Sequence, residues 1–438
     1  MKQSSSTINP LLNSIGEDVM GFLNEVQQMY PDAISLASGR PDEDYFKLEN
    51  FSHCFDFYVE HVAAEKGLKR EEVVKKLGQY NAAKGIVNEL AAEFLKNDED
   101  IQLTADDLVM TVGTQEAMAI SVLTLCDREN DVVLVEDPCY IGITHFCRIA
   151  GYQVEPVSVL KDGISLDDIE QQIEKISVSG KKVKLVYTIP DFQNPTGNSM
   201  PLGKRKALLE MAAKYDFFIV EDNAYGDFVY QDKKLPTLKA LDRNKRVIYL
   251  RSFSKTLYPT LRLSILAADQ IVINEGEQLA LSGLMAKTKG YLTVNTSAVN
   301  QAIFGGMLLK NKGSFLKMNT VKLRAMKQKR NLTIKTLKKC LNANWANEIS
   351  WNEPGGGFFL TVKLPFKISK ADVALCAEKY QVIFTPMSFF YLREGGEYEV
   401  RLAFSYLSPK EIELAIKGLS AYFKNKIHEN QNLSYERK

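Results

Sequence analysis

The sequence predicts an α/β fold. It has a large domain, with a mostly parallel seven-stranded sheet between helices, and a smaller α+β domain made from both chain ends. Three observations carry this prediction. Strand-like segments alternate with amphipathic helical segments from about residue 106 to residue 269. Some strand-like segments, such as Val132–Val135, are continuously apolar, which is typical of strands buried on both faces. After about residue 315 the pattern changes to longer helices separated by strand-like segments.

Each element follows from its local pattern of apolar residues and turn formers. The predicted strands of the central region are 106–113, 131–138, 153–159, 181–190, 217–224, 246–255 and 263–269. The helices expected between them are 114–126, 140–151, 166–176 and 204–215. The C-terminal part predicts helices at 321–341, 370–380 and 408–423, and strands at 356–364 and 398–406.

These elements suggest a division of the 438-residue chain into domains. Residues 1–70 are expected to form an N-terminal arm and part of the small domain, 71–314 the large domain, 315–425 the C-terminal part of the small domain, and 426–438 a flexible tail.

The composition of the chain argues against several classes of protein. The 55 basic and 54 acidic side chains give a net charge of +1, which argues against a dedicated nucleic-acid binder. No run of about 18 apolar residues indicates a membrane span, and the N-terminus lacks the pattern of a secretory signal. Six cysteines without a C-x-x-C pair, and four histidines without a paired spacing, favour reduced thiols in a cytoplasmic protein and no metal site.

Four motifs carry most of the functional information. D-F-Q-N-P-T-G (191–197) follows one predicted strand, and E-D-N-A-Y (221–225) closes another. S-F-S-K-T-L-Y-P-T-L-R (252–262) places a lysine between hydroxyl groups, and a late arginine lies in E-V-R-L-A-F-S-Y (399–406). Any one of these motifs has an ordinary structural explanation. In this order and at these spacings they form a specific combination.

The combination resembles the fold-type I pyridoxal-phosphate aminotransferases, and within them the kynurenine/2-aminoadipate aminotransferase group. The resemblance extends from about Ile34 to Phe423. It implies pyridoxal 5′-phosphate as cofactor, amino acid and 2-oxo acid substrates, and a homodimer with shared active sites.

The resemblance also assigns roles around the cofactor ring. Lys255 matches the lysine that the family joins to the cofactor, and such a lysine then acts as proton shuttle. Asp222 would keep the ring nitrogen protonated so that the ring accepts electrons. Asn194 and Tyr225 would donate to the ring's phenolic oxygen, and Tyr140 would stack on the ring face.

The phosphate site is implied in the same way. The V-G-T-Q turn at 112–115 joins a predicted strand to a predicted helix, whose first N–H groups favour an anion. Arg262 can form two parallel bonds to a phosphate. The remaining implied phosphate ligands are Thr114, Gln115, Ser252 and Ser254, with Tyr80 reaching the neighbouring subunit's phosphate.

The substrate side rests on Arg401 and on the loop L-A-S-G-R-P (36–41). Arg401 matches the arginine that grips the α-carboxylate, a role suited to a guanidinium fork. Gly39 and Arg40 are expected beside the side-chain pocket, together with Asn194. Relatives carry an apolar residue where this chain has Arg40, so we expect a polar, acidic or aromatic substrate side chain. Alternatively, Arg40 pairs with a nearby carboxylate of Asp42, Glu43 or Asp44.

The predicted reaction is transamination of an L-amino acid, with 2-oxoglutarate and glutamate as the second pair. Three alternatives stay open: a C–S or β-lyase, an oxidase, and a hydroxyarylglycine-type aminotransferase of secondary metabolism. A regulator with a DNA-binding domain would need some 70–100 residues before the catalytic body. Here the resemblance begins near residue 34 and the net charge is close to zero, so this class is disfavoured. A catalytically dead scaffold is disfavoured because Lys255, Asp222 and Arg401 are all present.

Overall fold

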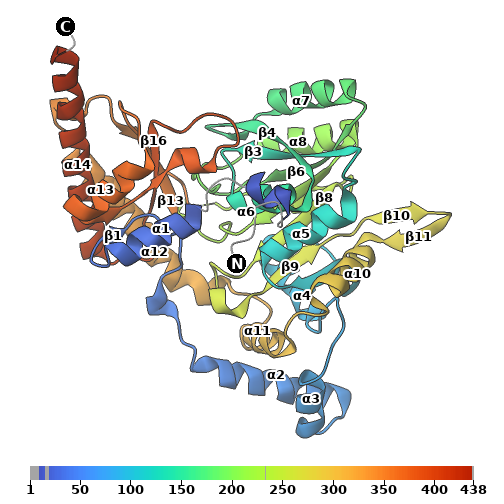
Figure 1. Cartoon of the computed structure of the whole chain (residues 1–438). Helices are drawn as coiled ribbons and strands as arrows, with labels where there is room; N and C mark the ends of the chain where they lie inside the picture. The colour runs from blue at the N-terminus through green and yellow to red at the C-terminus, as the bar shows by residue number, and fades with distance from the viewer. Residues whose placement is uncertain (1–8, 15–18, 232, 437–438) are drawn as a thin grey trace, which may run out of the picture.

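The computed structural model describes residues 9–14, 19–231 and 233–436. Two units lie side by side: a large α/β unit and a smaller one that contains both α1 and α14 (Figure 1). The large sheet has the strand order β2-β9-β8-β7-β6-β3-β4-β5 within the described residues. Its strands are β2 (Leu108–Thr111), β3 (Asp131–Asp137), β4 (Gln153–Leu160), β5 (Gly163–Ile164), β6 (Lys182–Thr188), β7 (Phe218–Asn223), β8 (Val247–Ser252) and β9 (Ser264–Ala267).

The sheet is mostly parallel, as predicted. Strands β4, β3, β6, β7 and β8 run parallel to one another, and β9 is antiparallel to both β8 and β2. All seven predicted strands form. The described sheet has an eighth, because the two-residue β5 pairs antiparallel with β4. A segment of two residues carries no readable periodicity, so the sequence did not predict it.

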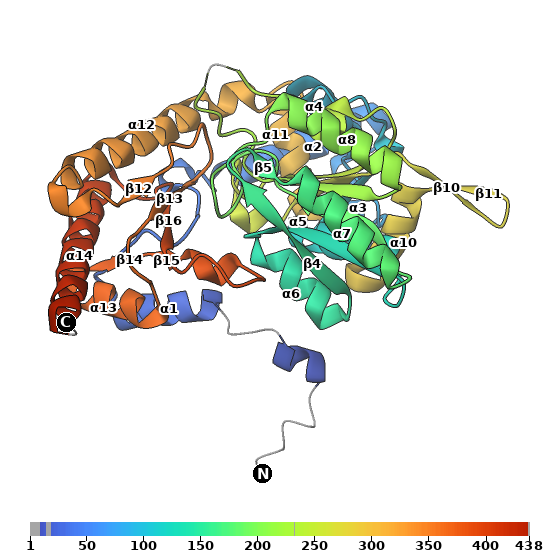
Figure 2. The same cartoon turned by 90° about the horizontal axis from the view of Figure 1, so that it is seen from above.

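Helices cover both faces of this sheet (Figure 2). On β3, Val132 and Leu134 belong to one apolar cluster, and Val133 and Val135 belong to another. Alternate side chains of one strand therefore enter different cores, which explains the continuous apolar run. The helices of this unit are α2 (Asn50–Lys66), α3 (Arg70–Leu77), α4 (Asn88–Glu99), α5 (Thr114–Leu125), α6 (Ile141–Ala150), α7 (Leu166–Val178), α8 (Leu202–Tyr215), α9 (Leu238–Leu241), α10 (Leu281–Thr293) and α11 (Ala298–Lys310).

The smaller unit is built from both ends of the chain, as predicted. Strand β1 (Ile34–Ser35) pairs in parallel with β14 (Val382–Ile383), almost 350 residues later. A second, antiparallel sheet has the order β12-β13-β16-β15. Its strands are β12 (Ser350–Trp351), β13 (Phe359–Lys363), β15 (Thr385–Pro386) and β16 (Glu399–Ala403), and the helices are α1 (Val19–Met29), α12 (Leu316–Cys340), α13 (Lys370–Tyr380) and α14 (Pro409–Glu436).

Two parts of the predicted domain division differ from the packing. Helix α2 lies before the expected boundary at residue 70, yet its Cys54 and Tyr58 belong to one core with Phe304 of α11, in the large unit. The tail expected to be flexible from residue 426 is helical as far as Glu436. It continues α14 because Ile427 is buried in the core of the small unit.

Strands β10 (Ile271–Asn274) and β11 (Glu277–Ala280) form a hairpin that projects from the large unit (Figures 1 and 2). In the described part of the chain, no helix is long and apolar enough to cross a membrane.

Candidate active site

A cavity of about 680 Å³ opens where the carboxyl ends of the parallel strands face the small unit. Open α/β sheets bind their ligands at this edge, because the loops that follow the strands converge there. Of the fourteen residues predicted from the sequence, thirteen line the cavity, and Tyr80 is the exception. The thirteen are Gly39, Arg40, Thr114, Gln115, Tyr140, Asn194, Asp222, Tyr225, Ser252, Ser254, Lys255, Arg262 and Arg401.

Lys255 follows β8, and its Nζ donates to the carbonyl oxygen of Gly39 at 2.7 Å. The pKa of Lys255 is lowered to about 8, chiefly by burial and then by the positive charges of Arg401 and Arg262. A lysine with such a pKa has a sizeable neutral fraction near pH 7 to 8. Its amine can therefore act as a nucleophile or a base.

Asp222 lies near the end of β7 and is buried. Its Oδ2 accepts a hydrogen bond of 2.7 Å from the hydroxyl of Tyr187, on the neighbouring strand β6. Burial raises the pKa of Asp222 to about 6, although this hydrogen bond and the charge of Lys255 act in the opposite direction. No donor among the described residues reaches Oδ1, which is also buried. The carboxylate therefore presents one unsatisfied oxygen, a costly arrangement in the absence of a ligand.

Arg401 comes from β16 of the small unit and reaches the same cavity. Its Nη1 donates to Oδ1 of Asn194 at 2.7 Å, and its Nη2 donates to the carbonyl oxygen of Ala37 at 2.6 Å. The guanidinium carbon lies 4.3 Å and 4.6 Å from the ring centres of Phe359 and Phe390. Burial lowers the pKa of Arg401 to about 10, so the group stays charged at neutral pH.

Two further polar side chains border the same space. Tyr225 is buried, and burial raises its pKa well above the usual range, while Arg401 and a hydrogen bond with Asn194 act to lower it. Its hydroxyl is therefore a donor at neutral pH. Tyr140 immediately precedes helix α6, and its hydroxyl lies 3.4 Å from Oε1 of Gln115.

The amino end of helix α5 forms another side of the cavity. The helix starts at Thr114 directly after Gly113, which has φ +76°. A Cβ at this position would lie 2.5 Å from Nη2 of Arg262, so glycine lets the guanidinium approach the start of the helix. Nη1 of Arg262 donates to the Ser254 hydroxyl at 3.3 Å. Free N–H groups, a guanidinium and a hydroxyl together make an anion site.

A family model for aminotransferase class I and II matches residues 59–419. The chain belongs to the class I and II aminotransferases. It is therefore a pyridoxal-phosphate-dependent transaminating enzyme, as the motifs predicted.

Individual relatives agree with this assignment. The aminotransferase is 38% identical over 418 residues to the (S)-3,5-dihydroxyphenylglycine transaminase of Amycolatopsis orientalis, covering 95% of this chain and 94% of the relative. It is 27% identical to a 2-aminoadipate transaminase of Thermus thermophilus, with 90% and 91% coverage. The structure of Pyrococcus horikoshii kynurenine aminotransferase superposes with a TM-score of 0.80 at 26% identity, covering 96% and 98%.

The cavity of the aminotransferase fits the cofactor of its family. The unsatisfied buried oxygen of Asp222 matches the protonated ring nitrogen of pyridoxal phosphate, which is a donor. The anion site at the start of α5 matches the phosphate.

The sequence did not single out every residue at this site. Tyr187 occupies the interior of an apolar strand, so its pattern is that of a core residue. The same holds for Phe359 and Phe390, which flank Arg401. His145 and Phe146 of α6 also line the cavity. Only Tyr140, immediately before α6, indicated that this helix borders the site.

Arg40 and Tyr80 lie at the periphery. Arg40 lines the cavity, and its guanidinium carbon lies 4.7 Å from the centre of the Tyr406 ring. Among the described residues Arg40 forms no ion pair with Asp42, Glu43 or Asp44, the alternative partners, and Asp42 pairs with Lys329 at 2.6 Å. Tyr80 is 79% exposed and does not reach the cavity of its own chain.

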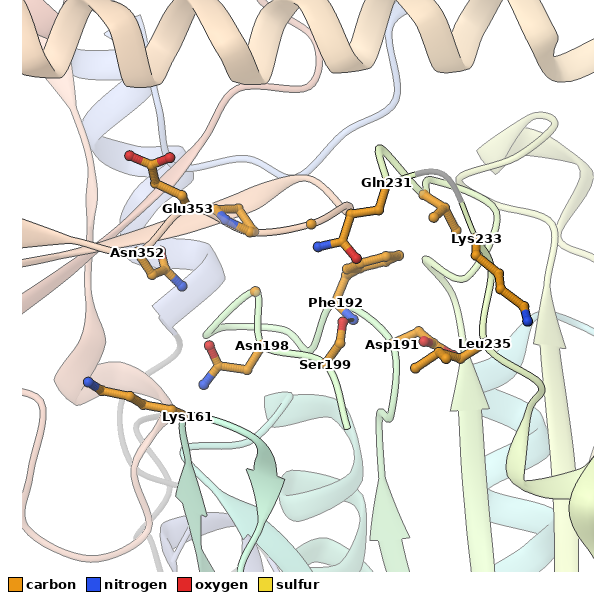
Figure 3. A pocket seen from close by; sticks show the side chains of 14 residues that line it. Lys161, Asp191, Phe192, Asn198, Ser199, Gln231, Lys233, Leu235, Asn352 and Glu353 are labelled. Carbon is orange, nitrogen blue, oxygen red and sulfur yellow. Dashed lines mark hydrogen bonds between the residues drawn. The ribbon is translucent and has the colours of Figure 1, made fainter. Parts of the chain in front are cut away.

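A second, smaller pocket of about 260 Å³ lies where the large unit meets the loop before β13 (Figure 3). Its walls are mostly polar, and Lys161 and Lys233 extend in different directions rather than toward a common point. Asn352 crosses between the units here, donating to the carbonyl oxygen of Thr196 at 2.7 Å. This pocket therefore lies at the contact between the two units, and the described side chains that line it do not bring reactive groups together at one point.

Proposed function

We propose that this aminotransferase holds pyridoxal 5′-phosphate in the 680 Å³ cavity, joined to Lys255. The observation that carries the proposal is the convergence of Lys255, Asp222 and Arg401, from three separate strands or strand ends, on this one space. Asp222 would receive the ring nitrogen, and Asn194 and Tyr225 would contact the ring oxygen. Tyr140 would cover one ring face.

The phosphate would lie at the start of helix α5. Thr114 and Gln115 offer the first N–H groups of the helix, and Arg262 supplies the counter-charge. Ser252 and Ser254 add hydroxyl donors from the segment that carries Lys255. We further propose a homodimer in which Tyr80 of each subunit reaches the phosphate of the other. Its 79% exposure in the single chain leaves it available for that contact.

Within this site each protein group has a defined task. The bound cofactor supplies an electron sink for the electrons that remain when the substrate Cα loses its proton. Once the substrate amine has displaced it from the cofactor, Nζ of Lys255 would take that proton and return it to another carbon, a role suited to a lysine whose pKa is about 8. Arg401 holds the α-carboxylate and so orients the Cα–H bond. Asp222 stays anionic beside the protonated ring nitrogen.

For the substrate we propose an arylglycine with ring hydroxyl groups, and 2-oxoglutarate as amino acceptor. The similarity to the dihydroxyphenylglycine transaminase supports the amino donor. The cavity also suits an arylglycine, since Phe146 and Ile149 of α6 offer apolar contacts to the ring and Arg40 offers hydrogen-bond donors to the ring hydroxyl groups. A site whose hydrogen-bond donors pair with substrate hydroxyl groups rejects analogues that lack those hydroxyl groups, because the donors are then left unpaired.

A second candidate is an acidic donor such as 2-aminoadipate. The guanidinium of Arg40 favours it, because a carboxylate is the natural partner of that group. The apolar residues of α6 favour the aromatic donor.

Two matched donor pairs test the proposal. Purified enzyme is assayed with (S)-3,5-dihydroxyphenylglycine against phenylglycine, and with 2-aminoadipate against norleucine, each followed by the 2-oxo acid formed. We expect the hydroxylated donor to exceed phenylglycine in kcat/KM by about tenfold or more, equivalent to about 1.4 kcal/mol. Arg40→Leu should remove most of that preference. If Arg40→Leu changes all four donors by one common factor, Arg40 does not contact the side chain. If the wild-type enzyme does not prefer the hydroxylated donor to phenylglycine, the substrate proposal fails.

A further inference from the structure

Helix α12 contacts two loops of the active site through two lysines on one helical face. Lys322 and Lys329 are seven residues apart, which places them on the same side of the helix. Nζ of Lys322 donates to the carbonyl oxygen of Thr256, the neighbour of Lys255, at 2.6 Å. Nζ of Lys329 donates to Oδ2 of Asp42 at 2.6 Å and to the carbonyl oxygen of Ser405 at 3.1 Å.

Asp42 ends the segment 37–42, whose carbonyl groups face the catalytic side chains. The carbonyl oxygen of Ala37 accepts from Arg401, and that of Gly39 accepts from Lys255. The carbonyl oxygen of Arg40 accepts from the hydroxyl of Ser405. Hydrogen bonds to its backbone carbonyl groups therefore hold this segment in place. The direction of the Arg40 side chain is not set by these bonds and depends on which anion or aromatic ring the guanidinium contacts.

The most immediate competitor for Arg40 is Asp42, two residues away in an extended stretch of chain. Both oxygens of Asp42 are engaged elsewhere. Oδ2 accepts from Lys329, and Oδ1 accepts from the backbone N–H of Asp44 at 3.2 Å. Asp42 and Lys329 are both buried, so little water weakens their attraction. The Arg40 side chain lies instead over the ring of Tyr406 and lines the cavity.

We infer that Lys329 is a positioning residue for substrate selectivity. By pairing with Asp42 it removes the carboxylate that would otherwise attract Arg40, and so keeps that guanidinium available to the substrate side chain. Lys329 itself does not line the cavity. The inference rests on the proposed function, in which Arg40 contacts the side chain of the amino donor.

Removing Lys329 would leave Asp42 buried without its cation, which is strongly unfavourable. We expect the guanidinium of Arg40, two residues along the chain, to replace it, since Nζ of Lys322 is already engaged with the carbonyl oxygen of Thr256. Neutralising Asp42 as well removes both the unpaired charge and the competitor. The single variant is therefore expected to lose selectivity and the double variant to keep it, a difference that loss of structure alone would not produce.

The experiment measures the kcat/KM ratio of (S)-3,5-dihydroxyphenylglycine to phenylglycine for the full-length enzyme loaded with pyridoxal phosphate. We expect Lys329→Met to lower this ratio about tenfold, close to the ratio of Arg40→Leu. Asp42→Asn and the double variant Lys329→Met/Asp42→Asn should keep the wild-type ratio within about twofold. Lys322→Met is the matched control on the same helix face, and it should leave the ratio unchanged even where total activity falls.

A crystal structure of Lys329→Met without substrate gives a second readout that does not depend on activity. The guanidinium of Arg40 should lie within about 4 Å of the Asp42 carboxylate, as in an ion pair. If Lys329→Met is not recovered as folded protein, Lys329→Gln with and without Asp42→Asn is measured in the same way.

The outcomes separate the two proposals. A normal ratio in Lys329→Met, or a double variant that does not regain the ratio, overturns the positioning role while leaving the proposed function intact. An unchanged ratio in Arg40→Leu overturns the proposed contact between Arg40 and the donor, and the positioning role with it.

Discussion

The Nζ of Lys255 donates to the carbonyl oxygen of Gly39 at 2.7 Å, although 216 residues separate them in the chain. Lys255 belongs to the large unit, and Gly39 belongs to the segment that follows β1 in the small unit. This bond links the two units within the cavity that both residues line. Burial of the amine lowers its pKa to about 8, and the positive charges of Arg401 and Arg262 act in the same direction, while the Asp222 carboxylate acts to raise it.

The lowered pKa of Lys255 predicts a dependence of stability on pH. At pH 7 the lysine is mostly charged in both the folded and the unfolded apoprotein, so burial of the charge destabilises the folded state. Between about pH 8 and the usual lysine value the folded state binds fewer protons than the unfolded state, and the destabilisation disappears as pH rises. Lys255→Met should therefore stabilise the apoprotein by about 2 kcal/mol at pH 7 and by progressively less above pH 8.

The measurement is urea denaturation of the apoprotein at several pH values. The exposed lysine Lys206 provides the control, since Lys206→Met should change stability by less than about 0.5 kcal/mol at every pH. A stabilisation by Lys255→Met that did not decline above pH 8 would show that packing, and not charge, is responsible.

The assignment of Lys255 also predicts its modification. Borohydride treatment of the yellow holoenzyme should fix the cofactor to one peptide, the one that contains Lys255, as detected by mass spectrometry. Lys255→Ala should lose transamination by several orders of magnitude, since it removes both the attachment point and the base. Turnover retained by Lys255→Ala would contradict the assignment.

The glycine at the start of α5 predicts a specific loss of cofactor affinity. Gly113→Ala introduces a Cβ 2.5 Å from Nη2 of Arg262, so the guanidinium must move away from the phosphate site. The dissociation constant of the apoprotein for pyridoxal phosphate should rise about tenfold or more. Affinity for pyridoxal, which has no phosphate, should change little.

Gly180→Ala is the matched control. Gly180 has φ +74°, close to the +76° of Gly113, but no atom lies within 4 Å of a Cβ built there. Both substitutions should cost about 1 kcal/mol of stability from backbone strain, and only Gly113→Ala should weaken cofactor binding. Equal cofactor affinity in the two variants would exclude the proposed phosphate position.

The hydrogen bond from Tyr187 to Asp222 predicts a shift in the pH profile. This bond stabilises the carboxylate, so its loss in Tyr187→Phe raises the pKa of Asp222 above about 6. The acidic limb of the kcat/KM profile should move to higher pH, and activity at neutral pH should fall about tenfold. Tyr249→Phe, a buried tyrosine on β8 whose hydroxyl accepts from Asn223, should not move this limb.

The shared site predicts complementation between two impaired subunits. Tyr80→Ala impairs the partner's site and Lys255→Ala impairs its own, so a hybrid dimer would carry one doubly altered site and one intact site. Mixing and reassembling the two variants at equal amounts should restore about a quarter of wild-type activity. Activity no greater than the sum of the two separate variants would argue that each site is built from one chain.

Much of the site could be predicted because its residues occupy recognisable places along the chain. Asp222 and Ser252 end parallel strands, and Thr114 opens the helix after β2. Apolar periodicity locates such strand ends, and parallel strands bring their carboxyl ends to one edge. The chemistry of a lysine, a carboxylate and an arginine at those places then narrows the function, even before their distances are known.

Tertiary structure alone decided which partner each buried polar group has. Tyr187 carries the pattern of a core residue, and only the pairing of β6 with β7 brings its hydroxyl to Asp222. Asp42 lay beside Arg40 in the sequence, yet its cation is Lys329, 287 residues away. Periodicity reports whether a side chain is buried, because burial depends on one element's own geometry. The choice of an ion-pair partner depends on the distances between elements that the chain folds together from far apart, and no local pattern contains those distances.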